Sequence, residues 1–128
     1  LGMGISVQII EQNKARCEEL SILLPKAVII NADGSDEEVL FEVGIEDVES
    51  FIPLTGIDEE NIMLTLHAKQ VSNAKVITKI TRTNFKSVIN NLDLGSLMYP
   101  QYIRCDNSLC KGEKCFKEQS YPDTLPAL

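Results

Sequence analysis

Short apolar runs alternate with amphipathic segments along this chain, and this alternation constrains its fold more than any other feature. The runs are four to six residues long and are bounded by turn formers such as Pro25 and Gly34, which is typical of buried strands. Residues 5–10 alternate and end in an apolar pair, so this strand is expected to be buried on both faces. The expected strands are residues 5–10, 27–30, 50–54, 75–80 and 96–99.

Four segments between these strands have the pattern of helices. Residues 12–24 carry apolar side chains at near-helical spacing ahead of a proline. A hydroxyl residue followed three positions later by an acidic residue is typical of a capping box, and two such pairs occur, Ser35 with Glu38 and Thr55 with Asp58. The helices are therefore expected at residues 12–24, 35–42, 55–71 and 85–92.

Alternating strands and helices predict an α/β fold with a doubly wound parallel sheet and right-handed crossovers. Ligands of such sheets bind at the carboxyl ends of the strands. A carboxylate at such an end can accept hydrogen bonds from both hydroxyls of a ribose. Taken alone, however, Glu11 can equally be a solvated loop residue, and Thr55 can be a helix N-cap. Polar residues follow four of the expected strands: Glu11, residues 31–34, residues 55–61, and Thr81 with Arg82.

The composition fits one ordinary globular domain and excludes several classes of protein. The chain has 128 residues, 44% of them hydrophobic, and a formal net charge of −7, so a nucleic-acid partner is not expected. No apolar run approaches the roughly 18 to 20 residues that cross a bilayer. The start of the sequence has no signal-peptide pattern, and we expect a cytoplasmic protein.

The charges are distributed unevenly along the sequence. Residues 11–60 contain fourteen acidic and three basic residues, whereas residues 61–103 contain five basic residues and one acidic residue. Such a change of sign can favour a small anion at one face, and solvated helix faces produce the same pattern.

Four motifs, in this order along the chain, resemble the nucleotide-binding domain of the peripheral subunit of bacterial Trk potassium uptake systems. They are Val-Gln-Ile-Ile-Glu at residues 7–11, Val-Ile-Ile-Asn-Ala-Asp-Gly-Ser-Asp at 28–36, Leu-Thr-Gly-Ile-Asp-Glu-Glu-Asn at 54–61 and Lys-Ile-Thr-Arg at 79–82. The same family contains the conductance-regulating cytosolic domains of potassium channels. The resemblance covers residues 2–103 and implies a Rossmann-like fold that binds NAD(H) or an adenine nucleotide, ATP or ADP.

The resemblance also implies partners and a location. Members of the family assemble into dimers or rings and transmit their ligand state to a membrane-embedded potassium transporter subunit. We therefore expect a homo-oligomer that lies peripherally on the inner face of the cell membrane.

Six residues at the expected strand ends match motif positions that contact ligand in the family. The resemblance assigns Glu11 to the adenosine ribose, Asp33 and Gly34 to the adenine side, Thr55 and Gly56 to the phosphate or nicotinamide end, and Arg82 to the phosphates.

The family pattern begins before this sequence does. In the family, a first strand, a Gly-rich phosphate loop and a helix precede the segment that matches residues 5–10. Gly2 and Gly4 do not form that loop, because they precede a strand instead of following one. We therefore expect an N-terminally truncated domain. Since the absent strand is central in the family topology, the sheet should contain a hole and ligand affinity should be poor.

The resemblance ends near residue 103, where the family has a long apolar helix with a Val-Arg-Ala stretch. One choice of codons for residues 104–116, read one nucleotide later, gives Asp-Ala-Ile-Ile-Leu-Cys-Val-Arg-Ala-Arg-Asn-Ala, which matches that helix. We expect a partial Rossmann-like domain at residues 1–103, followed by a divergent tail at 104–128 that is frameshifted or disordered.

Metal binding and catalysis are the remaining hypotheses. Cys105, Cys110, Cys115 and His67 would make four zinc ligands, but the cysteine spacing misses the roughly two to four residues typical of a zinc knuckle, so no metal is expected. Without an export signal the thiols are expected to be reduced. No catalytic triad or His-Glu-x-x-His motif includes His67, and we expect a regulatory domain instead of an enzyme. The alternative is a fragment of an NAD-dependent dehydrogenase, which uses the same fold.

Overall fold

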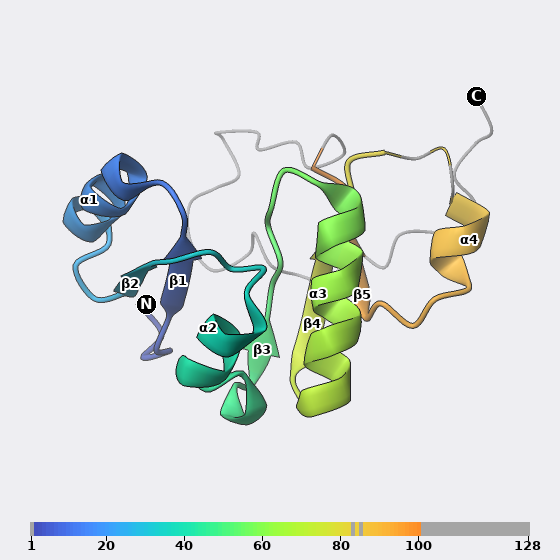
Figure 1. The fold of residues 1–128 in the computed structure, drawn as a ribbon, viewed down its shortest axis with the longest axis horizontal. Helices are drawn as coiled ribbons and strands as arrows, with labels where there is room; N and C mark the ends of the chain where they lie inside the picture. The colour runs from blue at the N-terminus through green and yellow to red at the C-terminus, as the bar shows by residue number, and fades with distance from the viewer. Residues whose placement is uncertain (1, 83, 85, 101–128) are drawn as a thin grey trace.

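The computed structural model describes residues 2–82, 84 and 86–100. Along this part of the chain short strands alternate with helices, as the sequence predicts (Figure 1). The expected tail at residues 104–128, with three of the four cysteines, lies outside the described residues. The element order is β1 (Gln8–Glu11), α1 (Lys14–Leu23), β2 (Val28–Asn31), α2 (Glu37–Glu42), the 3-10 helix η1 (Ile45–Asp47), β3 (Ser50–Phe51), α3 (Asp58–Val71), β4 (Lys75–Lys79), α4 (Lys86–Asn90) and β5 (Ser96–Met98).

The strands form two parallel sheets, which confirms the predicted α/β class. β1 pairs with β2, with Glu11 opposite Asn31 at the carboxyl end. In the second sheet β4 lies between β3 and β5. No ladder joins β1 to β3 in the described part of the chain, so the sheet is interrupted at the position where the sequence predicts a hole.

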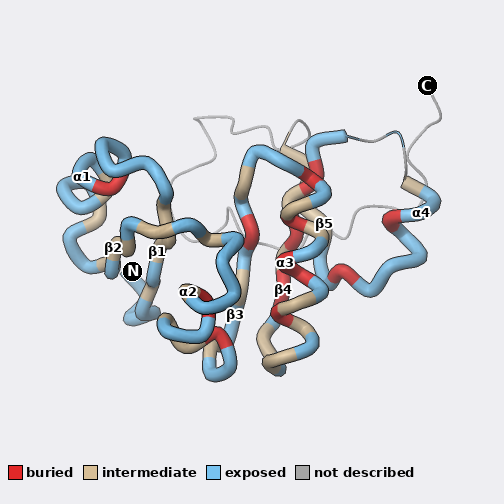
Figure 2. Tube along the Cα trace, in the orientation of Figure 1, coloured by how far each residue is buried: buried red, intermediate tan, exposed pale blue. Residues whose placement is uncertain are grey.

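One hydrophobic cluster connects the two sheets. Its buried members come from α2, η1, α3 and β4, and Ile10 of β1 and Phe51 of β3 pack against it. The segment that contains α2 and η1 therefore takes part in holding the sheets together through side-chain packing. Figure 2 shows the buried residues concentrated along α3 and β4, whereas α1 is mostly exposed and β1 and β2 are exposed or partly buried. The buried members are Leu40, Ile45, Leu64, Ala68 and Val76.

The two-stranded sheet is less buried than its apolar sequence predicts. β1 is exposed or only partly buried along its length, so the expectation of burial on both faces is wrong. In α1 the only buried residue is Cys17, and Ile22 and Leu23 remain 80% and 61% exposed. The cause is the interruption beside β1, which leaves β1 with β2 as its one neighbouring strand among the described residues and leaves the sheet with few packing partners.

β3 is also shorter than expected. It covers Ser50 and Phe51 only, although the sequence predicts residues 50–54. Pro53 follows within that segment, and a proline has no N–H to donate to a neighbouring strand.

Both predicted capping boxes are wrong. The N-cap of α2 is Asp36, whose Oδ1 accepts the Glu38 N–H at 2.9 Å. Ser35 instead donates both its N–H and its hydroxyl to the Asp33 carboxylate, a stronger acceptor two residues earlier. The N-cap of α3 is Ile57, which has no side-chain cap bond.

A buried polar chain joins α3, β4 and the segment before β5. The Thr78 hydroxyl donates to the Leu94 carbonyl at 2.8 Å. Its oxygen lies 2.6 Å from that of Thr65, which must then be the donor because the Thr78 proton is already used. Both threonines are fully buried, so each hydroxyl is satisfied inside the core.

Gly95 permits the close approach of this segment to β4. Its φ is +69°, and a Cβ at this position would lie 2.3 Å from the Val76 carbonyl oxygen. A glycine is therefore required by both conformation and contact.

Candidate functional site

The carboxyl ends of the strands form two groups of polar residues, one for each sheet. Glu11 and Asn31 end β1 and β2, and Lys79 ends β4. Thr55 follows β3, and Thr81 with Arg82 follows β4. Each group is fixed by hydrogen bonds of its own.

At the end of β1 the main chain of Glu11 is an anchor point. Its carbonyl accepts the Asn31 side-chain amide at 2.9 Å, the Ala32 N–H at 3.2 Å and the Cys17 thiol at 3.2 Å. One oxygen of the Glu11 carboxylate accepts the Asn13 N–H at 2.7 Å. No donor in the described part of the chain binds the other oxygen, which leaves an acceptor for a ligand hydroxyl.

Asp33 and Gly34 form the turn after β2. Two hydrogen bonds from Ser35 lower the pKa of Asp33, and the bond from the Ser35 hydroxyl has a larger effect than the bond from its N–H. This exposed carboxylate is therefore charged at neutral pH. A Cβ on Gly34 would make ordinary contact with Ile10 Cγ2 at 3.7 Å, so Gly34 lies against β1 and space alone does not require a glycine.

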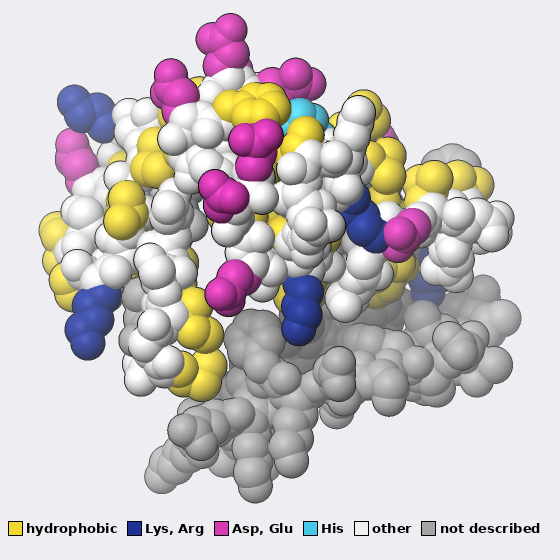
Figure 3. Space-filling model, turned by 90° about the horizontal axis from the view of Figure 1, so that it is seen from below, with side chains coloured by type: hydrophobic (Ala, Val, Ile, Leu, Met, Phe, Trp, Pro, Cys, Tyr) yellow, Lys and Arg dark blue, Asp and Glu magenta, His cyan; other side chains and the backbone are white. Residues whose placement is uncertain are grey.

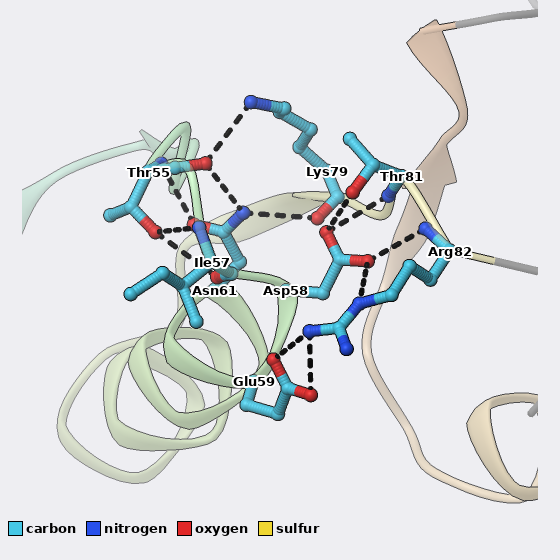
Figure 4. Close-up of polar contacts among 8 residues, drawn as sticks. All are labelled: Thr55, Ile57, Asp58, Glu59, Asn61, Lys79, Thr81 and Arg82. Atoms are coloured by element: carbon cyan, nitrogen blue, oxygen red, sulfur yellow. Dashed lines mark hydrogen bonds and ion pairs between the residues drawn. The ribbon is translucent and has the colours of Figure 1, made fainter.

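In the second group the Asn61 side chain is the central connector (Figure 4). It is fully buried on α3. Its Oδ1 accepts the Thr55 N–H at 2.9 Å, and its Nδ2 donates to the carbonyls of Thr55 and Lys79 at 3.2 and 3.1 Å. One amide therefore holds the chain after β3 against the end of β4.

Asp58 fixes the chain that leaves β4. This buried carboxylate accepts the Thr81 N–H and hydroxyl at 2.9 and 2.8 Å on Oδ1, and the Arg82 N–H at 2.7 Å on Oδ2. Burial by itself raises the pKa of Asp58, but the hydrogen bonds from Arg82 and Thr81, together with the Arg82 charge, hold this pKa below its ordinary value. Asp58 is therefore ionised at neutral pH.

Two cations lie at this edge. The Lys79 ammonium donates to the Thr55 carbonyl at 3.0 Å. The Arg82 guanidinium extends over the first turn of α3, where its Nη2 lies 2.7 and 2.5 Å from the two oxygens of Glu59 (Figure 4). Positive charge is thus present beside Thr55, and one of the two cations is already paired with a carboxylate.

Thr55 is a turn residue and not a helix cap. Its hydroxyl oxygen accepts the Ile57 N–H at 3.2 Å, and the helix begins only at Asp58. Gly56 is exposed, and a Cβ there would meet nothing within 4 Å. No steric reason therefore requires a glycine at position 56.

The six predicted site residues accordingly fall into two groups. Thr55, Gly56 and Arg82 belong to the edge held by Asn61 and Asp58, whereas the others belong to the end of the two-stranded sheet. The sequence interpretation missed the structural roles of Asn61 and Asp58. The available signal was their spacing of three residues at the start of a helix that follows a strand and a turn. This spacing places both side chains on one face of the helix.

A small cavity of about 270 Å³ lies between α2 and α3, lined in part by Leu40, Met63, Glu60 and His67. The His67 ring packs edge-on against Phe41 with a centroid distance of 6.1 Å, and no described residue hydrogen-bonds its buried Nε2. On the face shown in Figure 3, acidic side chains gather on one side of the chain's single histidine, and apolar side chains lie directly beside it. The described residues contain no group of His, Cys, Asp and Glu arranged to hold a metal ion.

Parallel sheets with interrupted continuity, helical crossovers and polar strand ends define a Rossmann-like α/β domain. The model of the TrkA-N domain family matches residues 2–100, and the chain belongs to this family. The resemblance inferred from the four motifs is therefore confirmed.

Curated relatives support this assignment. The chain is 35% identical over 98 residues to the Trk system potassium uptake protein TrkA of Haemophilus influenzae, covering 77% of this chain and 21% of the relative. It is 35% identical over 101 residues to TrkA of Vibrio alginolyticus, covering 79% and 22%. It is 33% identical over 95 residues to the Trk system potassium uptake protein trkA homolog 1 of Methanosarcina mazei, covering 74% and 23%. The chain thus spans about a fifth of the length of these relatives.

None of the helices in the described ranges is long and apolar enough to span a membrane.

Proposed function

We propose that this chain is a regulatory nucleotide-binding domain of a Trk-type potassium uptake system. The observation that carries the proposal is the TrkA-N match over residues 2–100, together with relatives named as Trk potassium uptake proteins. The ligand is NAD(H) or an adenine nucleotide, bound at the carboxyl ends of the strands. The domain acts by ligand-dependent contact with a membrane-embedded transporter subunit.

The end of the two-stranded sheet is the proposed nucleoside site. Glu11 accepts the ribose hydroxyls through its carboxylate, and Asp33 and Gly34 line the adenine side. Two features support this role: one Glu11 oxygen has no donor among the described residues, and Gly34 lies against Ile10 at the same edge. The hydrogen bonds of Asn31 to the Glu11 and Gln12 carbonyls hold this loop in place before a ligand arrives.

The edge held by Asn61 and Asp58 is the proposed phosphate or nicotinamide site. Thr55 and Gly56 contact this part of the ligand, and Arg82 faces the phosphates. The support comes from charge: Lys79 and Arg82 add two cations to an edge whose backbone is fixed by buried side chains. Fixed donors and cations reduce the ordering cost of binding a phosphate.

The function also includes partners and a location. The proposed assembly is a homo-oligomer, a dimer or larger, on the inner face of the membrane beside the transporter subunit. A regulatory role is favoured over that of a dehydrogenase fragment because the relatives are named as transport-system components. Accordingly we assign no catalytic residue.

Titration calorimetry with NADH, NAD, ATP, ADP and adenosine tests this proposal. Saturable binding of at least one nucleotide is expected, and Arg82→Gln should weaken ATP more than adenosine because it removes a phosphate contact. Added salt should reproduce part of that loss. If no nucleotide binds at millimolar ligand concentrations, the proposed function is contradicted. If Arg82→Gln weakens ATP and adenosine binding equally, the role of Arg82 is contradicted.

A further inference from the structure

Arg82 is held by two acidic residues that differ strongly in burial. Its backbone N–H donates to Asp58, a buried carboxylate that also lies 3.8 Å from the guanidinium Nε, whereas the guanidinium Nη2 binds both oxygens of Glu59. The Arg82 and Glu59 side chains are 62% and 66% exposed. Asp58 thus holds the main chain and the Nε side of Arg82, whereas the exposed Nη2 end is bound by an exposed carboxylate.

The tip can change partner at small cost. An exposed ion pair contributes little free energy because water and salt screen it. When Arg82 leaves, the Glu59 carboxylate remains in the first turn of α3, where the helix dipole and solvent stabilise a negative charge. Asp58 keeps the Arg82 main chain in place during the exchange.

Phosphate is a stronger partner for a guanidinium than one carboxylate is. It presents several acceptor oxygens and more than one negative charge, and it can be bound in a bidentate manner. A weakly charged anion binds a guanidinium less strongly than phosphate does, and the charge of Arg82 is already neutralised by Glu59. A pair of this kind can therefore discriminate between ligands by their charge.

We propose that Glu59 is a specificity-determining residue that holds Arg82 until the pyrophosphate or polyphosphate of a nucleotide displaces it. This inference rests on the proposed function, since it needs Arg82 to contact ligand phosphate. Glu59 itself leaves the guanidinium when the ligand binds. It acts as a competitor for Arg82 and not as a ligand contact.

The test compares Glu59→Gln with Glu60→Gln in the full chain. Glu60 is the next residue in the same first turn of α3, so its substitution removes the same charge without freeing Arg82. Titration calorimetry with ATP and with adenosine should show that Glu59→Gln tightens ATP binding about two- to fivefold more than Glu60→Gln does, the factor that corresponds to an exposed ion pair. Adenosine affinity should stay unchanged. In an Arg82→Gln background the two substitutions should have equal effects.

The possible failures are distinguishable. Equal tightening of ATP by both substitutions in the wild-type background would overturn the competition by Glu59 and leave the proposed function intact. Weaker ATP binding by Glu59→Gln, with an unchanged circular dichroism melting curve, would also overturn it, because Glu59 would then be a ligand contact. If no variant binds any nucleotide, the proposed function fails and this inference fails with it.

Discussion

The Asp58 carboxylate, in the first turn of α3, accepts the Arg82 backbone N–H at 2.7 Å although the two residues are 24 positions apart. With the two bonds from Thr81, it ties the start of a helix to the chain that leaves the neighbouring strand. Among the described residues, these three donors and the guanidinium, whose Nε lies 3.8 Å away, are the groups that satisfy its buried charge. This contact fixes the position of the proposed phosphate-binding arginine.

Asp58→Asn should destabilise the domain by about 1.5 to 3 kcal/mol, the range for losing a hydrogen bond to a charged group. An asparagine presents an NH2 group toward one of the N–H donors, so at least one buried donor loses its acceptor. Urea unfolding followed by circular dichroism measures the change. Glu60→Gln, on the same turn, is the control, and a loss as small as that of the control would contradict this role of Asp58.

The stability should also fall in acid. The pKa of Asp58 is lowered in the folded chain, and that of Asp93 is lowered too, chiefly by a hydrogen bond and charge from Lys69. A carboxylate with a depressed folded pKa contributes stability that is fully present above its unfolded pKa of about 3.9 and is lost as the pH falls toward the folded pKa. Unfolding free energies measured between pH 3 and 7 should therefore decrease below about pH 4, with a smaller decrease for Asp58→Asn. An equal pH dependence in wild type and variant would rule out Asp58 as a source.

The alternation of strands and helices, their parallel pairing and the interruption of the sheet could be predicted from the sequence, because they follow from local periodicity and an ordered set of motifs. The anchoring roles of Asp58 and Asn61 could not. Apart from Thr55, six positions before Asn61, their partners lie 18 to 24 positions away. The spacing from Thr55 to Asp58, in contrast, offered a complete local explanation in the form of a capping box. Asp58 does not complete that box because its carboxylate is already engaged by the chain after β4.

The prediction that β1 is buried on both faces failed for a related reason. An apolar run predicts a strand, but burial depends on what packs beside it, and no described strand pairs with the second edge of β1. The pairing of Arg82 with Glu59 could not be predicted either, since no local sequence pattern relates position 82 to position 59. Non-local contacts therefore account for most of what the sequence did not predict.

Thr78→Val should destabilise the domain by about 1 to 3 kcal/mol, because it leaves the buried Leu94 carbonyl and the Thr65 hydroxyl without their partner. Thr65→Val should cost less, since Thr78 still donates to Leu94. Chemical denaturation of both variants provides the comparison. A greater loss for Thr65→Val would reverse the assigned direction of these hydrogen bonds.

Gly95→Ala should be more harmful than Gly44→Ala. Both glycines have positive φ, +69° and +83°, but only at Gly95 would the new methyl meet a backbone oxygen, that of Val76 at 2.3 Å. The conformational penalty is about 1 to 2 kcal/mol at either position, and at Gly95 the steric conflict adds to it. Melting temperatures of the two variants, measured side by side, check this order, and equal shifts would show that β5 can move away from β4 without loss.

Glu11→Ala should weaken nucleotide binding by about 1 to 3 kcal/mol, the range for removing a hydrogen-bonding partner that carries a charge. Folding should be little affected, because the one side-chain hydrogen bond that Glu11 makes with described residues, from the Asn13 N–H, lies in an exposed turn. Glu18→Ala is the matched control, since it removes the same charge from the exposed part of α1 and leaves the end of β1 intact. Calorimetric titrations with NADH and ATP separate the two variants. If Glu11→Ala and Glu18→Ala change the affinity equally, Glu11 acts only through its charge, and the ribose must bind elsewhere.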